Sequence, residues 1–216
     1  MLNHGPYRTL GASLCCLLIF ATAFPGSDPA WRYLPLGMAH ILLGPDHLLF
    51  LLALALLVPE RRRLLLAVTA FALAHSLTLA LTALGVVPIP EPPVEAGIAL
   101  SIVILALELR RSQQGHLGLV VSSPWLAAFA FGLVHGLGFG AALGDLGLPH
   151  GAEGRALVAF NLGVEGGQLA FVLAVLGAWQ PLRKARLPRW TAALPAYGMG
   201  ALGLYWLGQR LLVMVA

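Results

Sequence analysis

The sequence predicts an all-α protein, a polytopic membrane helix bundle with six core transmembrane helices. Of its 216 residues, 59% are hydrophobic and 10% are charged, whereas a soluble domain carries about 25% charged residues. Apolar segments long enough to cross a hydrocarbon core of about 30 Å recur along the whole chain. Basic residues fall in alternate loops between these segments. Together these features leave no room for a separate soluble domain.

Residues 1–23 are predicted to be either a signal peptide or the first of seven transmembrane helices. Residues 9–20 are apolar and follow a short polar stretch that contains one arginine. The small residues at 21–23 come next, in the form of a signal-peptide cleavage site. A retained short helix over residues 9–25 is the alternative. In either case residues 24–216 are expected to form a single transmembrane helical domain.

The charge pattern of the loops predicts how the six core segments are oriented in the membrane. These segments cover residues 36–58, 63–87, 93–109, 124–147, 156–179 and 191–215. Basic residues follow the first, third and fifth segments: Arg61, Arg62, Arg63, Arg110, Arg111, Arg183, Lys184, Arg186 and Arg189. Most of the 13 lysines and arginines therefore lie on one side, which predicts that this side is cytoplasmic. The formal charge of +4 belongs to these loops and not to a nucleic-acid surface.

Small residues predict close helix packing on two of the segments. Glycines at spacing i, i+4 form a ladder on the fourth segment, and the spacing recurs on the fifth. Such spacing lets two helix backbones approach closely in lipid. The second and fourth segments also share the pattern F-x-L-x-H-x-L, at residues 71–77 and 131–137. This short match suggests a parallel internal repeat, whose interface is a common place for a binding site.

Four segments carry an ionisable residue to the same depth, which predicts a site near the membrane midplane. The helical rise of about 1.5 Å per residue places His47, His75, His135 and Glu165 roughly 13–18 Å into their segments. The midplane of a core about 30 Å thick lies at this level. An ionisable group there costs at least a few kcal/mol, so such residues usually mark a pathway or a binding site.

The first segment is expected to break at Gly44-Pro45, between two histidines. On a continuous helix His40 and His47 would share a face about 10 Å apart, and an incoming ion would meet His40 first. Asp46 would point roughly 100° away from His47. Pro45 has no N–H to donate and clashes with the preceding turn, so the helix should kink or open here. An opened turn could bring Asp46 inward beside both histidines.

These side chains predict a site for a divalent transition metal. The fifth segment carries Asn161, Glu165 and Gln168 on one helical face. Imidazole and carboxylate ligands suit Ni, Co, Zn, Cu or Fe better than Mg or Ca. The alternative for a single membrane histidine or amide is a hydrogen bond between helices. The predicted metal ligands are His40, Asp46, His47, His75, His135 and Glu165, with Asn161 and Gln168 as secondary candidates.

Five blocks of sequence between about residues 36 and 170 resemble the HupE/UreJ family of hydrogenase and urease accessory membrane proteins. They are Gly37-x-x-His40…Gly44-Pro45-Asp46-His47-Leu-Leu-Phe50, Phe71-x-x-Ala74-His75-Ser76-Leu-Thr78, Glu95-Ala-x-Ile98-Ala-Leu-Ser101, Phe131-Gly-Leu-x-His135-Gly-Leu-Gly-Phe139 and Phe160-Asn161-Leu-Gly163-Val-Glu165-x-Gly167-Gln168. The resemblance implies a secondary permease for nickel or cobalt that supplies metalloenzyme maturation. The family's histidine-aspartate signature falls on His40, Asp46 and His47, its acidic position on Glu165, and a retained aromatic position on Phe71.

The expected function is therefore a permease for a divalent transition metal, with Ni²⁺ as its substrate and Co²⁺ or Zn²⁺ as alternatives. The sequence has no GxxxxGK[ST] motif, so energy would come from an ion gradient, the membrane potential or a partner. The resemblance further implies a bacterial inner membrane and hydrogenase or urease maturation proteins as partners. The basic loops predict that the six core segments begin and end outside, so the C-terminus is expected to be periplasmic. The alternatives are an intramembrane zinc-dependent hydrolase, with Glu165 or Asp46 as general base, and a metal-sensing or chaperoning subunit.

Overall fold

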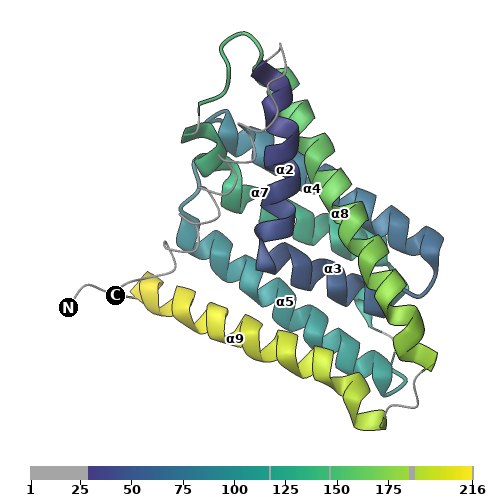
Figure 1. Ribbon diagram of the computed structural model, residues 1–216. Helices are drawn as coiled ribbons and strands as arrows, with labels where there is room; N and C mark the ends of the chain where they lie inside the picture. Colours follow the sequence, from purple (N-terminus) through teal and green to yellow (C-terminus); the bar gives the residue numbers. More distant parts are fainter. Residues whose placement is uncertain (1–28, 117, 146, 185–187, 216) are drawn as a thin grey trace.

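The computed structural model describes residues 29–116, 118–145, 147–184 and 188–215. Within these ranges every regular element is a helix, so the predicted all-α class is confirmed. The segment 1–23, predicted as a signal peptide or a first membrane helix, lies outside the described residues. Figure 1 shows the helices packed as one bundle around the junction between α2 and α3.

The long helices follow the predicted segments with small shifts at their ends. They are α4 (Arg61–Ala83), α5 (Glu91–Gln113), α7 (Pro124–Asp145), α8 (Glu153–Lys184) and α9 (Leu194–Val215). The first predicted segment is split into α2 (Tyr33–Leu43) and α3 (Pro45–Leu57). Three short elements complete the order: η1 (Pro29–Arg32), α6 (Leu119–Ser122) and η2 (Arg189–Ala193).

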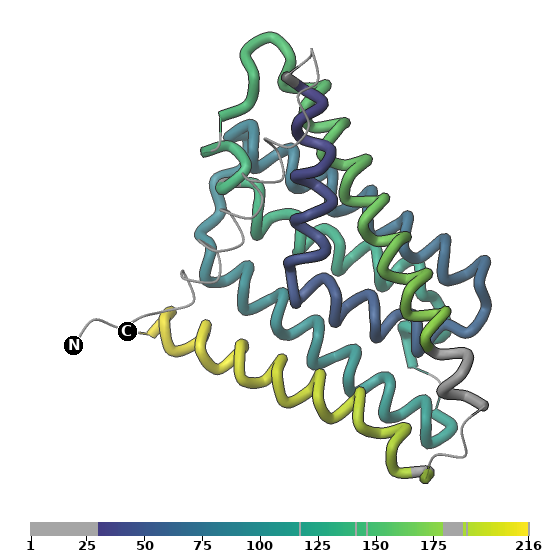
Figure 2. Tube along the Cα trace, in the orientation of Figure 1, coloured from purple at the N-terminus to yellow at the C-terminus, as the bar shows by residue number. Residues whose placement is uncertain are grey.

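The predicted break in the first segment is confirmed. Helices α2 and α3 are bent by 70° at Gly44, whose φ of −86° and ψ of 101° are extended and not helical. Pro45 is the first residue of α3, where its missing N–H has no helical partner to lose. The trace in Figure 2 shows the chain turning sharply at this point.

The chain is a multi-pass membrane protein by the length and composition of its helices. Four of them, α4, α5, α7 and the part of α8 up to Ala178, are long and apolar enough to cross a membrane. The bent pair α2–α3 makes a fifth span if it is counted as one. Helix α9 has 22 residues but is not among these candidates, and it contains Gln209 and Arg210 in its last two turns. The number of six core spans therefore stays a prediction.

The glycine ladder of α7 packs against α4, as its spacing predicts. Gly132 faces the Phe71 backbone, Gly136 the His75 carbonyl, Gly140 the Leu79 carbonyl and Thr82, and Gly144 the Ala83 backbone. Residue numbers rise together on both helices, so α4 and α7 run parallel. The two copies of F-x-L-x-H-x-L thus lie side by side in one helix pair.

The directions of the other pairs agree with a chain that alternates between the two sides of a membrane. Helices α2 and α8 also run parallel, because Gly163 faces Leu34 and Gly167 faces Met38. Helices α5 and α9 run antiparallel, because Gly200 faces Ala106 whereas Gly203 faces the Ala99 carbonyl, further toward the N-terminus of α5. In an alternating bundle the first and fifth spans share a direction, and so do the second and fourth.

We predict that Gly136→Ala destabilises the protein, because the new Cβ would overlap the His75 carbonyl and the Thr78 hydroxyl oxygen. Overpacking of this kind costs about 1–3 kcal/mol, and it should lower the Tm of the protein in detergent. Gly177→Ala is the matched control, since a Cβ at Gly177 has no neighbour within 4 Å. Equal Tm values for the two variants would contradict close packing of α4 and α7.

Candidate metal centre

Three histidines from three helices meet inside the bundle. The ligand atoms of His40 on α2, His47 on α3 and His75 on α4 all lie within 4.8 Å of one another. A fourth histidine, His135 on α7, has its ring centroid 5.4 Å from that of His47. All four side chains are buried, with at most 8% of their surface exposed. The structure therefore brings together the four membrane histidines that were predicted as ligands.

The bend between α2 and α3 places His40 and His47 next to each other. Their ring centroids are 4.7 Å apart, compared with about 10 Å along the axis of a continuous helix. His40 therefore belongs to the same cluster as His47. The expectation that an ion would meet His40 first, about 10 Å from His47, assumed a continuous helix. No side chain fits at Gly44, because a Cβ there would lie 2.8 Å from His47 Nδ1 and 2.9 Å from the His40 carbonyl oxygen.

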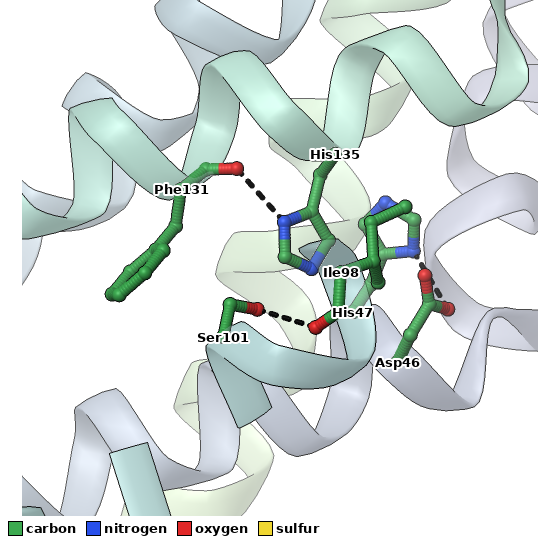
Figure 3. Close-up of polar contacts among 6 residues, drawn as sticks. All are labelled: Asp46, His47, Ile98, Ser101, Phe131 and His135. Atoms are coloured by element: carbon green, nitrogen blue, oxygen red, sulfur yellow. Dashed lines mark hydrogen bonds and ion pairs between the residues drawn. The ribbon is translucent and has the colours of Figure 1, made fainter. Parts of the chain in front are cut away.

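Asp46 lies beside His47 and bonds to its ring. Asp46 Oδ1 is 3.1 Å from His47 Nδ1, an interaction drawn in Figure 3. When Nδ1 carries the proton it donates to this carboxylate, and Nε2 then presents its lone pair to the cluster. Metal-binding histidines commonly have such a carboxylate partner, which fixes the ring and makes it more basic. Asp46 is thus placed to orient His47, and the group of three mutually close ligand atoms does not include it.

His135 is oriented in a similar way by its own helix. Its Nδ1 is 2.8 Å from the carbonyl oxygen of Phe131, one turn earlier on α7. Because a carbonyl can only accept, Nδ1 donates and Nε2 is left with its lone pair free. Its ring lies next to that of His47, with the centroids 5.4 Å apart. The two ring orientations are therefore set by hydrogen bonds that leave Nε2 available to a ligand.

Five ring nitrogens of the cluster are buried without a hydrogen-bond partner among the described residues. They are His40 Nε2, His47 Nε2, His75 Nδ1, His75 Nε2 and His135 Nε2, all buried. A buried polar atom without a partner costs about 1–3 kcal/mol, so natural proteins rarely leave several together. Their convergence fits a metal ion, because neutral imidazole nitrogen is a good ligand for Ni, Co, Zn and Cu.

Aromatic rings enclose the cluster on the side of His40. The Phe139 centroid lies 4.1 Å from that of His40, and the Phe160 centroid lies 5.7 Å from it. These two phenylalanines, from α7 and α8, stack on each other at 6.0 Å. Phe160 is 1% exposed and Phe139 is 8% exposed. This pair therefore packs against the His40 ring on one side of the cluster.

A second aromatic group packs against His135. Phe50 on α3 stacks on Phe71 on α4 with centroids 4.5 Å apart. Both rings also approach His135, at 5.4 and 5.3 Å. Phe131 packs against Phe50 at 5.9 Å. The family resemblance gave a role to Phe71 alone. Phe131 and Phe139 lie four residues before and after His135, and this helical spacing could have indicated that aromatic rings surround the histidines.

The predicted ligands on α8 behave differently from the histidines. Glu165 is half-buried and does not belong to the group of close ligand atoms, so its role as a ligand stays a prediction. Gln168 is fully buried, and neither of its amide atoms has a hydrogen-bond partner in the part of the chain that the structure describes. Its neighbour Gly167 packs against Met38 and Ile41, which places Gln168 near the level of His40. The carbonyl oxygen of the Asn161 side chain is also buried and unpartnered.

Comparison with known proteins identifies the family. A family model described as HupE / UreJ protein matches residues 20–210. The match includes all four helices that contribute histidines to the cluster. No curated protein and no solved structure gives a significant match to the chain. Because the family model covers most of the sequence, this chain belongs to the HupE/UreJ family.

Proposed function

We propose that this protein is a permease for a divalent transition metal, with Ni²⁺ as its substrate. The observation that carries the proposal is the convergence of four buried histidines from four helices. Ligand atoms of three of them lie within 4.8 Å of one another, and each of the four has a buried ring nitrogen without a hydrogen-bond partner among the described residues. Membership of a family of metal-handling accessory transporters supports a metal-transport role. Co²⁺ and Zn²⁺ are the alternative ions, because both also accept imidazole ligands.

The chemistry of the cluster suits an ion that must leave water to cross the bilayer. Ring nitrogens of His40, His47, His75 and His135 would replace water in the ion's coordination sphere. The carboxylate of Asp46, held against His47, would supply negative charge close to the ion without occupying a ligand position. This arrangement lowers the cost of placing a divalent charge at bilayer depth. Imidazole ligands also discriminate against Mg²⁺ and Ca²⁺, which prefer oxygen.

A zinc-dependent hydrolase is the second candidate, because three histidines are also the ligand set of some catalytic zinc sites. Two features argue against it. The rings of Phe139, Phe71 and Phe50 lie directly against the histidines, so the enclosed cluster suits a bare ion better than a peptide or lipid substrate. The HupE/UreJ family is also a transporter and accessory family. We further infer that the transported metal supplies hydrogenase or urease maturation proteins, in keeping with that family.

Liposomes that contain a metal-sensitive dye test the function directly. We predict that the wild-type protein admits Ni²⁺ but not Mg²⁺. We also predict that His75→Ala lowers the initial rate by about tenfold or more, since even the loss of a partner that only orients a metal ligand costs about 10–100-fold in affinity or activity. His116→Ala is the matched control, because His116 is an exposed loop residue and should leave the rate unchanged. Binding of Ni²⁺ by the wild type without any uptake would favour a sensing or chaperoning subunit.

The role assigned to Asp46 makes a separate prediction. Asp46→Asn removes the charge that orients His47, and we expect Ni²⁺ affinity to fall by about 10–100-fold and accumulation in cells at low external Ni²⁺ to be abolished. Calorimetric titration of the purified protein and a cellular uptake assay measure the two effects. Asp145→Asn removes an exposed carboxylate at the end of α7 and serves as the control. Normal affinity and uptake in Asp46→Asn would rule out this mechanism.

A further inference from the structure

The ring of His40 is supported differently from the rings of two other histidines in the cluster. His47 bonds to Asp46, and His135 donates to the carbonyl oxygen of Phe131. The buried Nε2 atom of His40 has no hydrogen-bond partner among the described residues. His40 also lies in the last turn of α2, directly before the break, where a helix no longer bonds all of its own carbonyl groups. Its ring therefore needs another support if it is to act as a metal ligand.

Phe139 makes the closest ring contact of His40. The two centroids are 4.1 Å apart and the ring planes are inclined by 32°, so the rings meet largely through their faces. Phe160 completes the group, 5.7 Å from His40 and stacked on Phe139 with 15° between the planes. All three side chains are at most 8% exposed. The imidazole of His40 is thus packed against a buried aromatic surface.

The backbone on both sides of Phe139 is fixed by close contacts with other helices. A Cβ atom on Gly138 would lie 2.8 Å from the Cδ1 atom of Ile98, on α5. A Cβ atom on Gly140 would overlap the side chain of Thr82, on α4. Helix α7 therefore lies directly against two helices at this point, and the fold determines the direction in which the Phe139 ring projects.

Phe160 is held against the helix that carries His40. A Cβ atom on Gly37 would overlap the carbonyl oxygen of Phe160, and Gly37 precedes His40 by three residues on α2. The three rings therefore come from three helices whose backbones are each in contact with a neighbour. Through these rings the α2–α8 pair meets the α4–α7 pair beside the cluster.

A bound ion would strengthen the contact between Phe139 and His40. An imidazole that binds a divalent ion takes on part of its positive charge, and the face of an aromatic ring attracts positive charge. An aliphatic side chain could fill the same volume, but it would have no such face. The contact also restricts rotation of the His40 side chain before the ion arrives, so less freedom is lost on binding.

We propose that Phe139 is a positioning residue for the metal site, whose ring fixes the His40 imidazole within reach of the other cluster histidines. This inference rests on the proposed function, in which the cluster binds the transported ion. It gives an aromatic ring the same role for His40 that the Asp46 carboxylate has for His47. Loss of the ring should loosen one ligand and leave the other three histidines in place.

Titration of the purified protein with Co²⁺ tests this role, because the visible absorption of bound Co²⁺ depends on its ligands. Phe139→Met keeps the apolar volume, so the Tm should stay close to that of the wild type, but it removes the ring. The Co²⁺ affinity should fall by about three- to tenfold, in keeping with the strength of aromatic and cation–π contacts. The absorption at saturation should weaken as well, because water would replace the nitrogen of His40 and raise the coordination number.

Two aromatic variants show whether the ring itself is responsible. Phe139→Tyr retains the aromatic face and should keep the affinity within about twofold of the wild type. Phe160→Leu should cause a smaller loss than Phe139→Met, because Phe160 lies further from His40. A Phe139→Tyr variant that binds Co²⁺ as weakly as Phe139→Met would contradict the proposal.

Leu143→Ala is the matched control, since Leu143 is fully buried one turn after Phe139 on α7. Its cavity should lower the Tm and leave the Co²⁺ affinity and absorption unchanged. If Phe139→Met changes only the Tm, or if both variants lose affinity equally, the ring is ordinary packing and the proposal is refuted. A wild-type protein that binds Co²⁺ but admits no Ni²⁺ into liposomes would refute the permease, while the same titrations would still decide the role of Phe139.

Discussion

The broken turn at Gly44-Pro45 is the constraint on which the histidine cluster depends. The 70° bend places His47 beside His40, and it turns Asp46 so that its carboxylate reaches the Nδ1 atom of His47. Gly44 is required because a Cβ would meet the His47 ring, the His40 carbonyl and the Asp46 carboxylate. Broken helices are tolerated at membrane depth only where the freed backbone is buried in protein or lines a site. Here the break lies in the wall of the cluster.

The two parallel helix pairs hold the rest of the centre in place. Gly136 lies against the backbone of His75, so the side chains of His75 and His135 project from adjoining turns of α4 and α7. Glycines on α8 bring that helix equally close to α2, which carries His40. A metal site needs ligands fixed to within about 0.5 Å. Where two helix backbones are in direct contact, few flexible side chains lie between them. The histidines that these helices carry are therefore held in fixed relative positions.

Much of this centre could be predicted from depth and spacing, because the rise of an α-helix is fixed. His47, His75 and His135 were predicted at one level for that reason, and the structure groups them. The sequence could not show whether Asp46 would bind the ion itself or orient His47, because the answer depends on the geometry of the opened turn. The aromatic enclosure was also missed, because Phe50 and Phe160 look like ordinary lipid-facing or packing residues in apolar segments. The half-buried position of Glu165 depends on how α8 rotates against α2, which spacing alone does not determine.

The different positions of the carboxylate and the imidazoles agree with what transport of an ion requires. A site on a transport pathway must bind its ion well enough to admit it and weakly enough to release it. Two carboxylates in direct contact with a divalent ion at low dielectric would hold it too tightly to leave. In this protein the carboxylate of Asp46 is 26% exposed, whereas the four imidazoles of the cluster are buried. In the proposed permease, negative charge would attract and dehydrate the ion at the more exposed carboxylate, and the buried nitrogen ligands would hold it reversibly.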